Sequence, residues 1–161
     1  MHTDEPAGAQ RSDRSDSGIS PGEAPGSVPL GSTSIPSNAD APRAARAAIH
    51  RWMHASFPLT LLQDAQLLIS ELVSNSFQHA GPADSARITV SAGTLDGVVW
   101  FDVADVGGRG GVARRAPQGY GGMGLNMVNA AASRWGTSRG DSTHVWFELP
   151  VRPPHAPLRQ H

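Results

Sequence analysis

Two polar side chains, Glu71 and Asn75, lie four residues apart in the largely apolar stretch Leu67 to Gly81. In a helix this spacing places the carboxylate and the carboxamide side by side, opposite a run of apolar positions. No Lys or Arg occurs between Arg51 and Arg87, so Glu71 has no cationic partner nearby in the sequence. An unpaired carboxylate beside an amide oxygen suits a hard metal ion with oxygen ligands. The alternative is a half-buried amphipathic helix without a site.

Two predicted strands each bring one polar group to their apolar side. Alternation over Val98 to Asp105 places Asp105 on the side of the strand's inward apolar residues, and alternation over Thr143 to Leu149 does the same for Thr143. A carboxylate and a hydroxyl on one inner face could bind one edge of a buried heterocycle, with the carboxylate accepting from an amine. The alternative for Asp105 is a residue that simply ends its strand before a turn.

A glycine-rich segment separates these strands. Eight glycines between Gly107 and Gly124 predict a mobile loop or lid, and Gly121 to Gly124 lead into a helix. A glycine-rich entry to a helix presents bare amides to an anion such as phosphate, although such loops also occur without ligands. The apolar face expected of this helix comprises Leu125, Val128, Ala131 and Ala132. Gly136, which follows Trp135, is the expected end of the helix.

The remaining predicted elements position these groups. Asp40 is expected to cap a helix with Pro42 in its first turn, which Phe57-Pro58 ends. The helix that carries Glu71 begins near Thr60 and stops at Gly81-Pro82. A strand over Arg87 to Ala92 pairs antiparallel with the strand over Val98 to Asp105, because Asp96-Gly97 is a strong hairpin turn.

Composition limits the class of protein. The chain has 161 residues, 39% of them apolar, no Cys and a net charge of −1, which favours one globular domain in the cytoplasm. No apolar run is long enough for a membrane span. All thirteen cations are Arg, which excludes a Walker-type Lys, and the charge provides no basic field for direct nucleic acid binding.

Three regions are expected along the chain. Residues 1–36 are rich in Gly, Pro and Ser and predict a disordered tail, in which Ser27 to Ile35 is a weak candidate for an edge strand because of its Pro and Gly. Residues 37–150 form the folded domain, and residues 151–161 are a second disordered tail.

The order of motifs resembles a known family. Along the chain these are E-L-V-S-N-S-F-Q-H-A, a strand ending D-V-G-G, a glycine lid, G-M-G-L-N-M-V, R-W-G and T-H-V-W-F-E-L. Over about Ile35 to Pro150 they resemble the histidine-kinase-like ATPase domains, and within these the stand-alone anti-sigma factor serine/threonine kinases and regulatory relatives of actinomycetes. The resemblance implies an α+β two-layer sandwich with a mixed, mostly antiparallel sheet covered on one face by helices.

The resemblance also implies ligands and residue roles. ATP and Mg²⁺ are the implied cofactors, with Asn75 as the magnesium ligand, Glu71 as the candidate base and Asp105 as the acceptor for the adenine amine. The other nucleotide-binding positions that it implies are His79, Gly107, Gly122, Gly124, Leu125 and Thr143. His79 is equally compatible with a packing or capping role.

The implied function is an anti-sigma factor kinase. Such a protein phosphorylates a serine of an anti-sigma factor antagonist, sequesters a sigma factor and could form a homodimer. Two alternatives use the same residues: a nucleotide-gated binding module without kinase activity, and an ATP hydrolase in which Glu71 orients water. The chain departs from the family at Gln78, at Arg109 and at Ser142 with His144, where sensor kinases or relatives often carry other residues. These departures bear on phosphoryl transfer more than on nucleotide binding.

Overall fold

The computed structural model describes residues 20–79, 86–106 and 123–151. Five strands form one sheet in the order β1-β2-β3-β5-β4, and each neighbouring pair is antiparallel. Their bounds are β1 (Val28–Pro36), β2 (Arg87–Leu95), β3 (Val98–Val106), β4 (Arg134–Arg139) and β5 (Thr143–Pro150). The sheet of the described residues is thus wholly antiparallel, whereas a mixed, mostly antiparallel sheet was expected.

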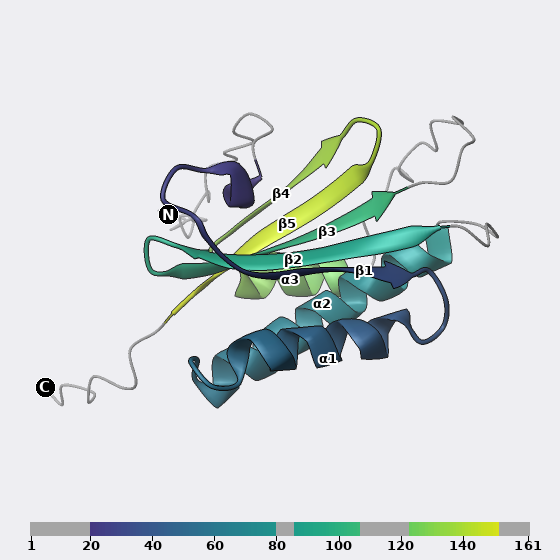
Figure 1. The fold of residues 1–161 in the computed structure, drawn as a ribbon. Coiled ribbons are helices and arrows are strands. Elements are labelled where there is room, and N and C mark those ends of the chain that lie inside the picture. The colour runs from purple at the N-terminus through teal and green to yellow at the C-terminus, as the bar shows by residue number, and fades with distance from the viewer. Residues whose placement is uncertain (1–19, 80–85, 107–122, 152–161) are drawn as a thin grey trace, which may run out of the picture.

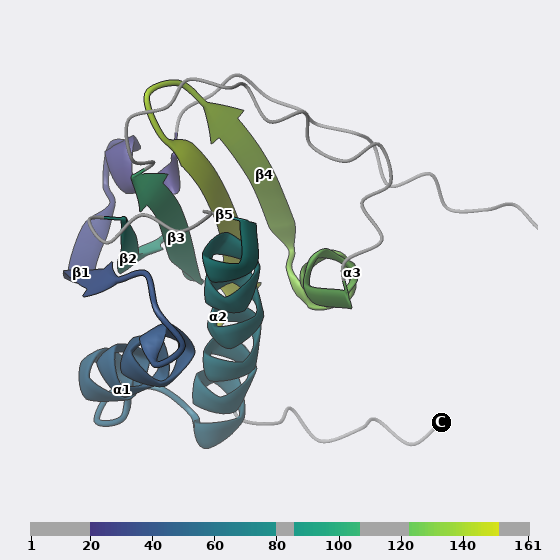
Figure 2. The same ribbon diagram turned by 90° about the vertical axis from the view of Figure 1, so that its right-hand side faces the viewer.

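Three helices cover one face of this sheet, as Figure 1 and Figure 2 show. They are α1 (Ala41–Met53), α2 (Leu59–His79) and α3 (Met123–Ala131). A short 3-10 helix, η1 (Pro21–Glu23), lies on the other face. The predicted two-layer α+β fold is confirmed. None of the helices in the described ranges is long and apolar enough to cross a membrane.

The core lies between α1, α2 and the inner face of the sheet. Alternation turns Val99, Phe101 and Val103 of β3 inward, where the rings of Phe101 and Phe147 stack at 4.9 Å between centroids. Helix α2 buries Ile69, Leu72 and Val73, as its period predicts, whereas Phe77, one turn after Val73, is 38% exposed. Ala131, at the last position of α3, is also exposed rather than packed.

The hairpin of β2 and β3 forms where the sequence predicts it. Asp96 and Gly97 both have positive φ, 47° and 80°, which is the geometry that a two-residue hairpin turn needs. The pairing places Ile88 opposite Asp105. Asp40 is the residue before α1, as expected, but its side chain makes no capping hydrogen bond; its amide instead donates to Oδ1 of Asn38 at 3.0 Å.

The tail predicted for residues 1–36 is wrong in its second half. Val28–Pro36 form β1, which pairs with β2, and Ile35 is only 5% exposed. An edge strand tolerates Pro29, and Gly31 is needed because a Cβ there would clash with the indole ring of Trp52. At the other end, the amide of Val151 donates to the carbonyl of Gly97 at 2.9 Å, and the rest of that predicted tail lies outside the described residues.

Strand β4 was not predicted at all. Trp135 and Gly136, expected to close the preceding helix, belong to β4, because α3 already ends at Ala131. Gly136 faces the ring of Trp146 on β5, and a Cβ at this position would lie 2.7 Å from Cζ2 of that ring. Gly136 therefore allows β4 to approach the Trp146 ring on β5 and does not end a helix.

Candidate functional site

Glu71 and Asn75 lie one turn apart on α2, and both are partly exposed. The ion pairs among the described residues join Arg134 to Glu148 and His144 to Asp102, so Glu71 is outside both. Within the part of the chain that the structure covers, no three His, Asp or Glu side chains gather into a metal cluster. A magnesium ion at Asn75 would therefore take few ligands from these residues and most from phosphate and water, as Mg²⁺ commonly does with nucleotides.

Asp105 stands at the end of β3 on the side of the core strand residues. Its Oδ1 atom is buried and has no hydrogen-bond partner among the described residues. Burial raises the pKa of the Asp105 carboxyl above its usual 3.8, because the charged form loses water without gaining a donor. A buried acceptor in this state suits an incoming N–H group. An exocyclic amine of a purine is such a donor.

Thr143 lies directly opposite Asp105 in the pairing of β3 with β5, so the two side chains share one side of the sheet. Thr143 is exposed, which leaves its hydroxyl accessible. The structure thus brings together the two polar groups that alternation alone assigned to an inner face. The two groups meet because β3 pairs with β5, although the glycine-rich segment separates these strands in the sequence.

The end of α2 that carries Asn75 lies at the same end of the molecule as the end of β3 and the start of β5 (Figure 1). Helix α2 contacts both strands. The candidate metal and base residues are therefore at the same end of the fold as Asp105 and Thr143. This arrangement can hold a flat heterocycle at the sheet and a polar chain beside the helix.

The other predicted site residues are only partly described. His79 is the last residue of α2, and Gly124 and Leu125 lie in the first turn of α3. The predicted helix after the glycine-rich segment is thus present, and its N-terminus follows that segment directly. Gly107 and Gly122, and with them the predicted lid, lie outside the described residues.

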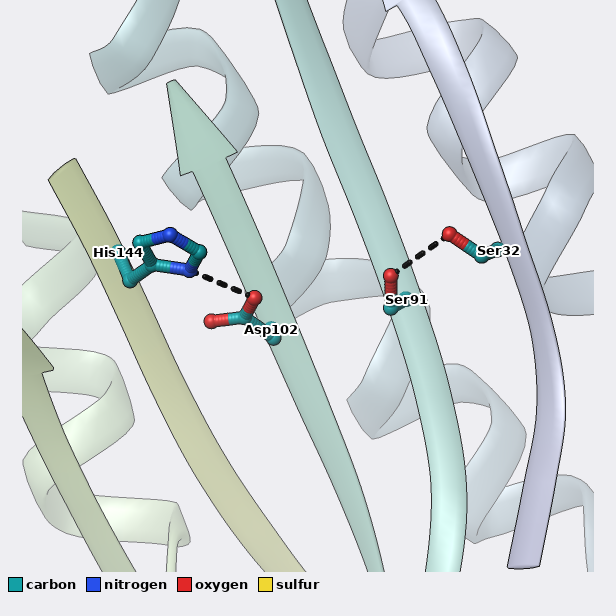
Figure 3. A network of polar contacts seen from close by, with 4 residues as sticks. All are labelled: Ser32, Ser91, Asp102 and His144. Atoms are coloured by element: carbon teal, nitrogen blue, oxygen red, sulfur yellow. Dashed lines mark hydrogen bonds and ion pairs between the residues drawn. The ribbon is translucent and has the colours of Figure 1, made fainter. Parts of the chain in front are cut away.

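A second polar group, on the opposite face of the sheet, was not predicted (Figure 3). His144 Nδ1 lies 2.9 Å from Oδ2 of Asp102, and Ser32 and Ser91 bond through their hydroxyls at 2.8 Å. Burial raises the pKa of Asp102, while the hydrogen bond and the charge of His144 lower it. Period two already turns Asp102 away from Asp105. What the sequence could not provide was the β3–β5 register, which sets His144 opposite Ala104.

That register also shows where the expected departures from the resembled pattern lie. The side chain of His144, noted above as a departure from the resembled pattern, is bound to Asp102 on the face away from the helices. Gln78, a second departure, is exposed near the end of α2. Arg109 lies outside the described residues.

Comparison with known proteins places the chain in a family. Residues 35–149 match the family model described as the histidine kinase-like ATPase domain, which is more than half of the chain. No curated protein matches it. The family match agrees with the antiparallel sheet, the helices on one face and the unpartnered carboxylate at the end of β3. The chain therefore belongs to the histidine kinase-like ATPase family and is an ATP-binding protein of that family.

Proposed function

We propose that this domain binds magnesium-ATP at the end of α2, β3 and β5 and transfers its γ-phosphoryl group to a serine or threonine of a protein partner. The observation that carries the proposal is the buried, unpartnered Oδ1 of Asp105. A buried acceptor without a donor is rare in native proteins and calls for a ligand that supplies one. The adenine amine is a donor of the right kind, with Thr143 beside it in the sheet.

Asn75 and Glu71 supply what the phosphate end requires. Asn75 offers a neutral amide oxygen to Mg²⁺, which when bound neutralises charge on the phosphates. Glu71, one helical turn away, has no cationic partner within the described ion pairs. Its carboxylate is thus available to hold the incoming hydroxyl and accept its proton.

The serine oxygen forms a bond to the γ-phosphorus as the bond from that phosphorus to the β–γ bridging oxygen breaks. The hydroxyl proton passes to the Glu71 carboxylate, and ADP is released. Catalysis of this kind depends mainly on position and charge, which a helix packed on two strands can provide.

We propose an anti-sigma factor antagonist as the phosphorylated partner and a sigma factor as the sequestered one. The support is the order of motifs along the chain, which is similar to that of anti-sigma factor kinases. A nucleotide-gated binding module and an ATP hydrolase would use the same residues. The position of His144 favours the first of these alternatives, because its side chain is held on the opposite face and adds no charge beside the phosphates.

The test is incubation of the purified protein with γ-labelled ATP, Mg²⁺ and a candidate antagonist. Label on a serine of the antagonist, lost when that serine is replaced by Ala, would support the kinase. Release of free phosphate without transfer would identify a hydrolase instead. Antagonist or sigma factor binding that changes with ATP, without label on any product, would leave the gated binding module.

A further inference from the structure

Two histidines stand on the exposed side of α1, apart from the nucleotide site. His50 and His54 are one helical turn apart, both are exposed, and their rings lie parallel within 2° at 4.9 Å between centroids. They occupy the C-terminal end of α1, which lies beside the start of α2 and thus at the other end of that helix from Asn75 (Figure 1). They have no part in the proposed phosphoryl transfer.

The backbone fixes which ring nitrogen of His54 is free. Nδ1 of His54 lies 3.0 Å from the carbonyl oxygen of His50. A carbonyl oxygen only accepts, so Nδ1 carries the proton and donates, and Nε2 keeps its lone pair. Metal-binding histidines commonly use one ring nitrogen for a backbone carbonyl in this way and the other for the metal. The hydrogen bond therefore leaves Nε2 as the metal-binding nitrogen of His54. Because the two rings are stacked in parallel, the His50 ring must turn about its side-chain bonds before both lone pairs can meet at one metal.

The charges around the pair are the main argument against a cation there. Arg51 is adjacent in sequence and exposed, and Arg46 lies one turn before His50. The guanidinium of Arg46, however, is drawn to α2, where Nη1 donates to Oγ of Ser70 at 2.8 Å. The C-terminal end of a helix attracts cations, and solvent screens the exposed Arg51. The pair can thus accept a cation despite its neighbours.

We propose that His50 and His54 form a binding site for a divalent transition metal that prefers imidazole nitrogen, such as Zn²⁺ or Ni²⁺. Two histidines at i and i+4 on one helix face are the spacing used by helical zinc sites. No third His, Asp or Glu gathers with them among the described residues, so water completes the coordination and the affinity stays below that of a closed structural site. Mg²⁺ prefers oxygen and does not compete.

The test is calorimetric titration with Zn²⁺ and with Ni²⁺, without nucleotide and buffered above neutral pH, because a protonated imidazole cannot bind a metal. The chain has seven histidines, and His2, His155 and His161 lie in segments outside the described residues. A full-length parent with these three replaced by Gln removes their contribution. We expect one metal per chain in this parent.

His50→Gln and His54→Gln should each weaken metal binding by roughly tenfold or more. Mutation of a residue that only hydrogen-bonds to a metal ligand already lowers metal affinity by about 10 to 100-fold. Arg51→Gln is the matched control on the same helix and should bind at least as well as the parent. Circular dichroism checks that each variant is folded. Equal metal affinity in parent and folded His50→Gln would overturn the site.

A second measurement needs no substitution at the site. Paramagnetic Ni²⁺ added to the parent should broaden the ring resonances of His50 and His54 before those of His144. Broadening that begins elsewhere contradicts the proposal. One metal per two chains, lost in both variants, would support the same pair as a ligand shared between copies.

Discussion

Replacing Asp105 with Asn exchanges one oxygen for an amide nitrogen and keeps the shape of the side chain. Without nucleotide, the buried Oδ1 of Asp105 has no donor among the described residues, so the charge opposes folding. Asp105 is only partly buried, which limits that cost. We therefore expect Asp105→Asn to be as stable as the parent, or more stable by up to about 1 kcal/mol.

ATP affinity should change in the opposite direction. A hydrogen bond to a charged acceptor is worth about 1.5 to 3 kcal/mol, and each 1.4 kcal/mol corresponds to about tenfold in affinity. Asp105→Asn should thus bind ATP about 10 to 150-fold more weakly. A gain or no change in stability together with a loss of affinity is the signature of a residue kept for its ligand.

The same carboxyl predicts a dependence on pH. Burial raises its pKa in the folded state above 3.8, so folding favours the protonated form. The favourable contribution of the Asp105 carboxyl to folding stability is complete below its pKa in the unfolded state. This contribution is lost as the pH rises through its pKa in the folded state. ATP requires the ionised acceptor, so affinity should fall as the pH is lowered toward that raised pKa. Asp105→Asn should lose this part of both pH dependences.

Calorimetric ATP titration and urea unfolding measure the two effects. The matched control is Asp102→Asn, which changes the same residue type on the same strand but on the face away from the helices. The control should keep its ATP affinity. Unchanged affinity in folded Asp105→Asn, or an equal loss in both variants, would refute an adenine-binding role for Asp105.

Three further predictions follow from other elements. Asn75→Ala should weaken magnesium-dependent ATP binding, whereas Glu71→Gln should keep the affinity and lower single-turnover transfer by about 10² to 10⁴-fold; the reverse pattern would contradict the assigned roles. Deletion of residues 1–36 removes β1 and should lower the melting temperature sharply, a result that an unaltered melting curve would exclude. Gly31→Ala should cost about 1 to 3 kcal/mol of unfolding free energy in urea, because the new methyl group meets Trp52; a neutral effect would show that the indole moves aside.

Local patterns were enough for the elements whose contacts are local. Asp96-Gly97 specifies its own turn, and the period of 3.6 residues in α2 selects its buried face without help from distant segments. β1 was predicted only as a weak candidate over Ser27 to Ile35, and β4 was not predicted, because the glycines of both strands are explained by remote partners. Gly31 is required by Trp52 on α1, and Gly136 by Trp146 on β5.

The candidate site, too, could be predicted from the sequence only in part. Period two was sufficient to place Asp105 and Thr143 on one side of their strands, but their pairing depends on β5 lying beside β3 across the glycine-rich segment. The exposure of Phe77, one turn after the buried Val73, does not follow from helical periodicity. The roles assigned to Glu71 and Asn75 stay predictions, because position on a helix does not reveal chemistry.

The composition of β1 has a consequence for aggregation. A regular strand at the edge of a sheet offers unpaired amides and carbonyls to any other extended chain. Pro29 and Pro36 lack an amide hydrogen, and the pairing register shifts between Pro29 and Gly31. Another strand could not add to this edge with a continuous ladder of hydrogen bonds. The residues that make β1 only a weak strand candidate in the sequence therefore also protect the sheet from growing into fibrils at that edge.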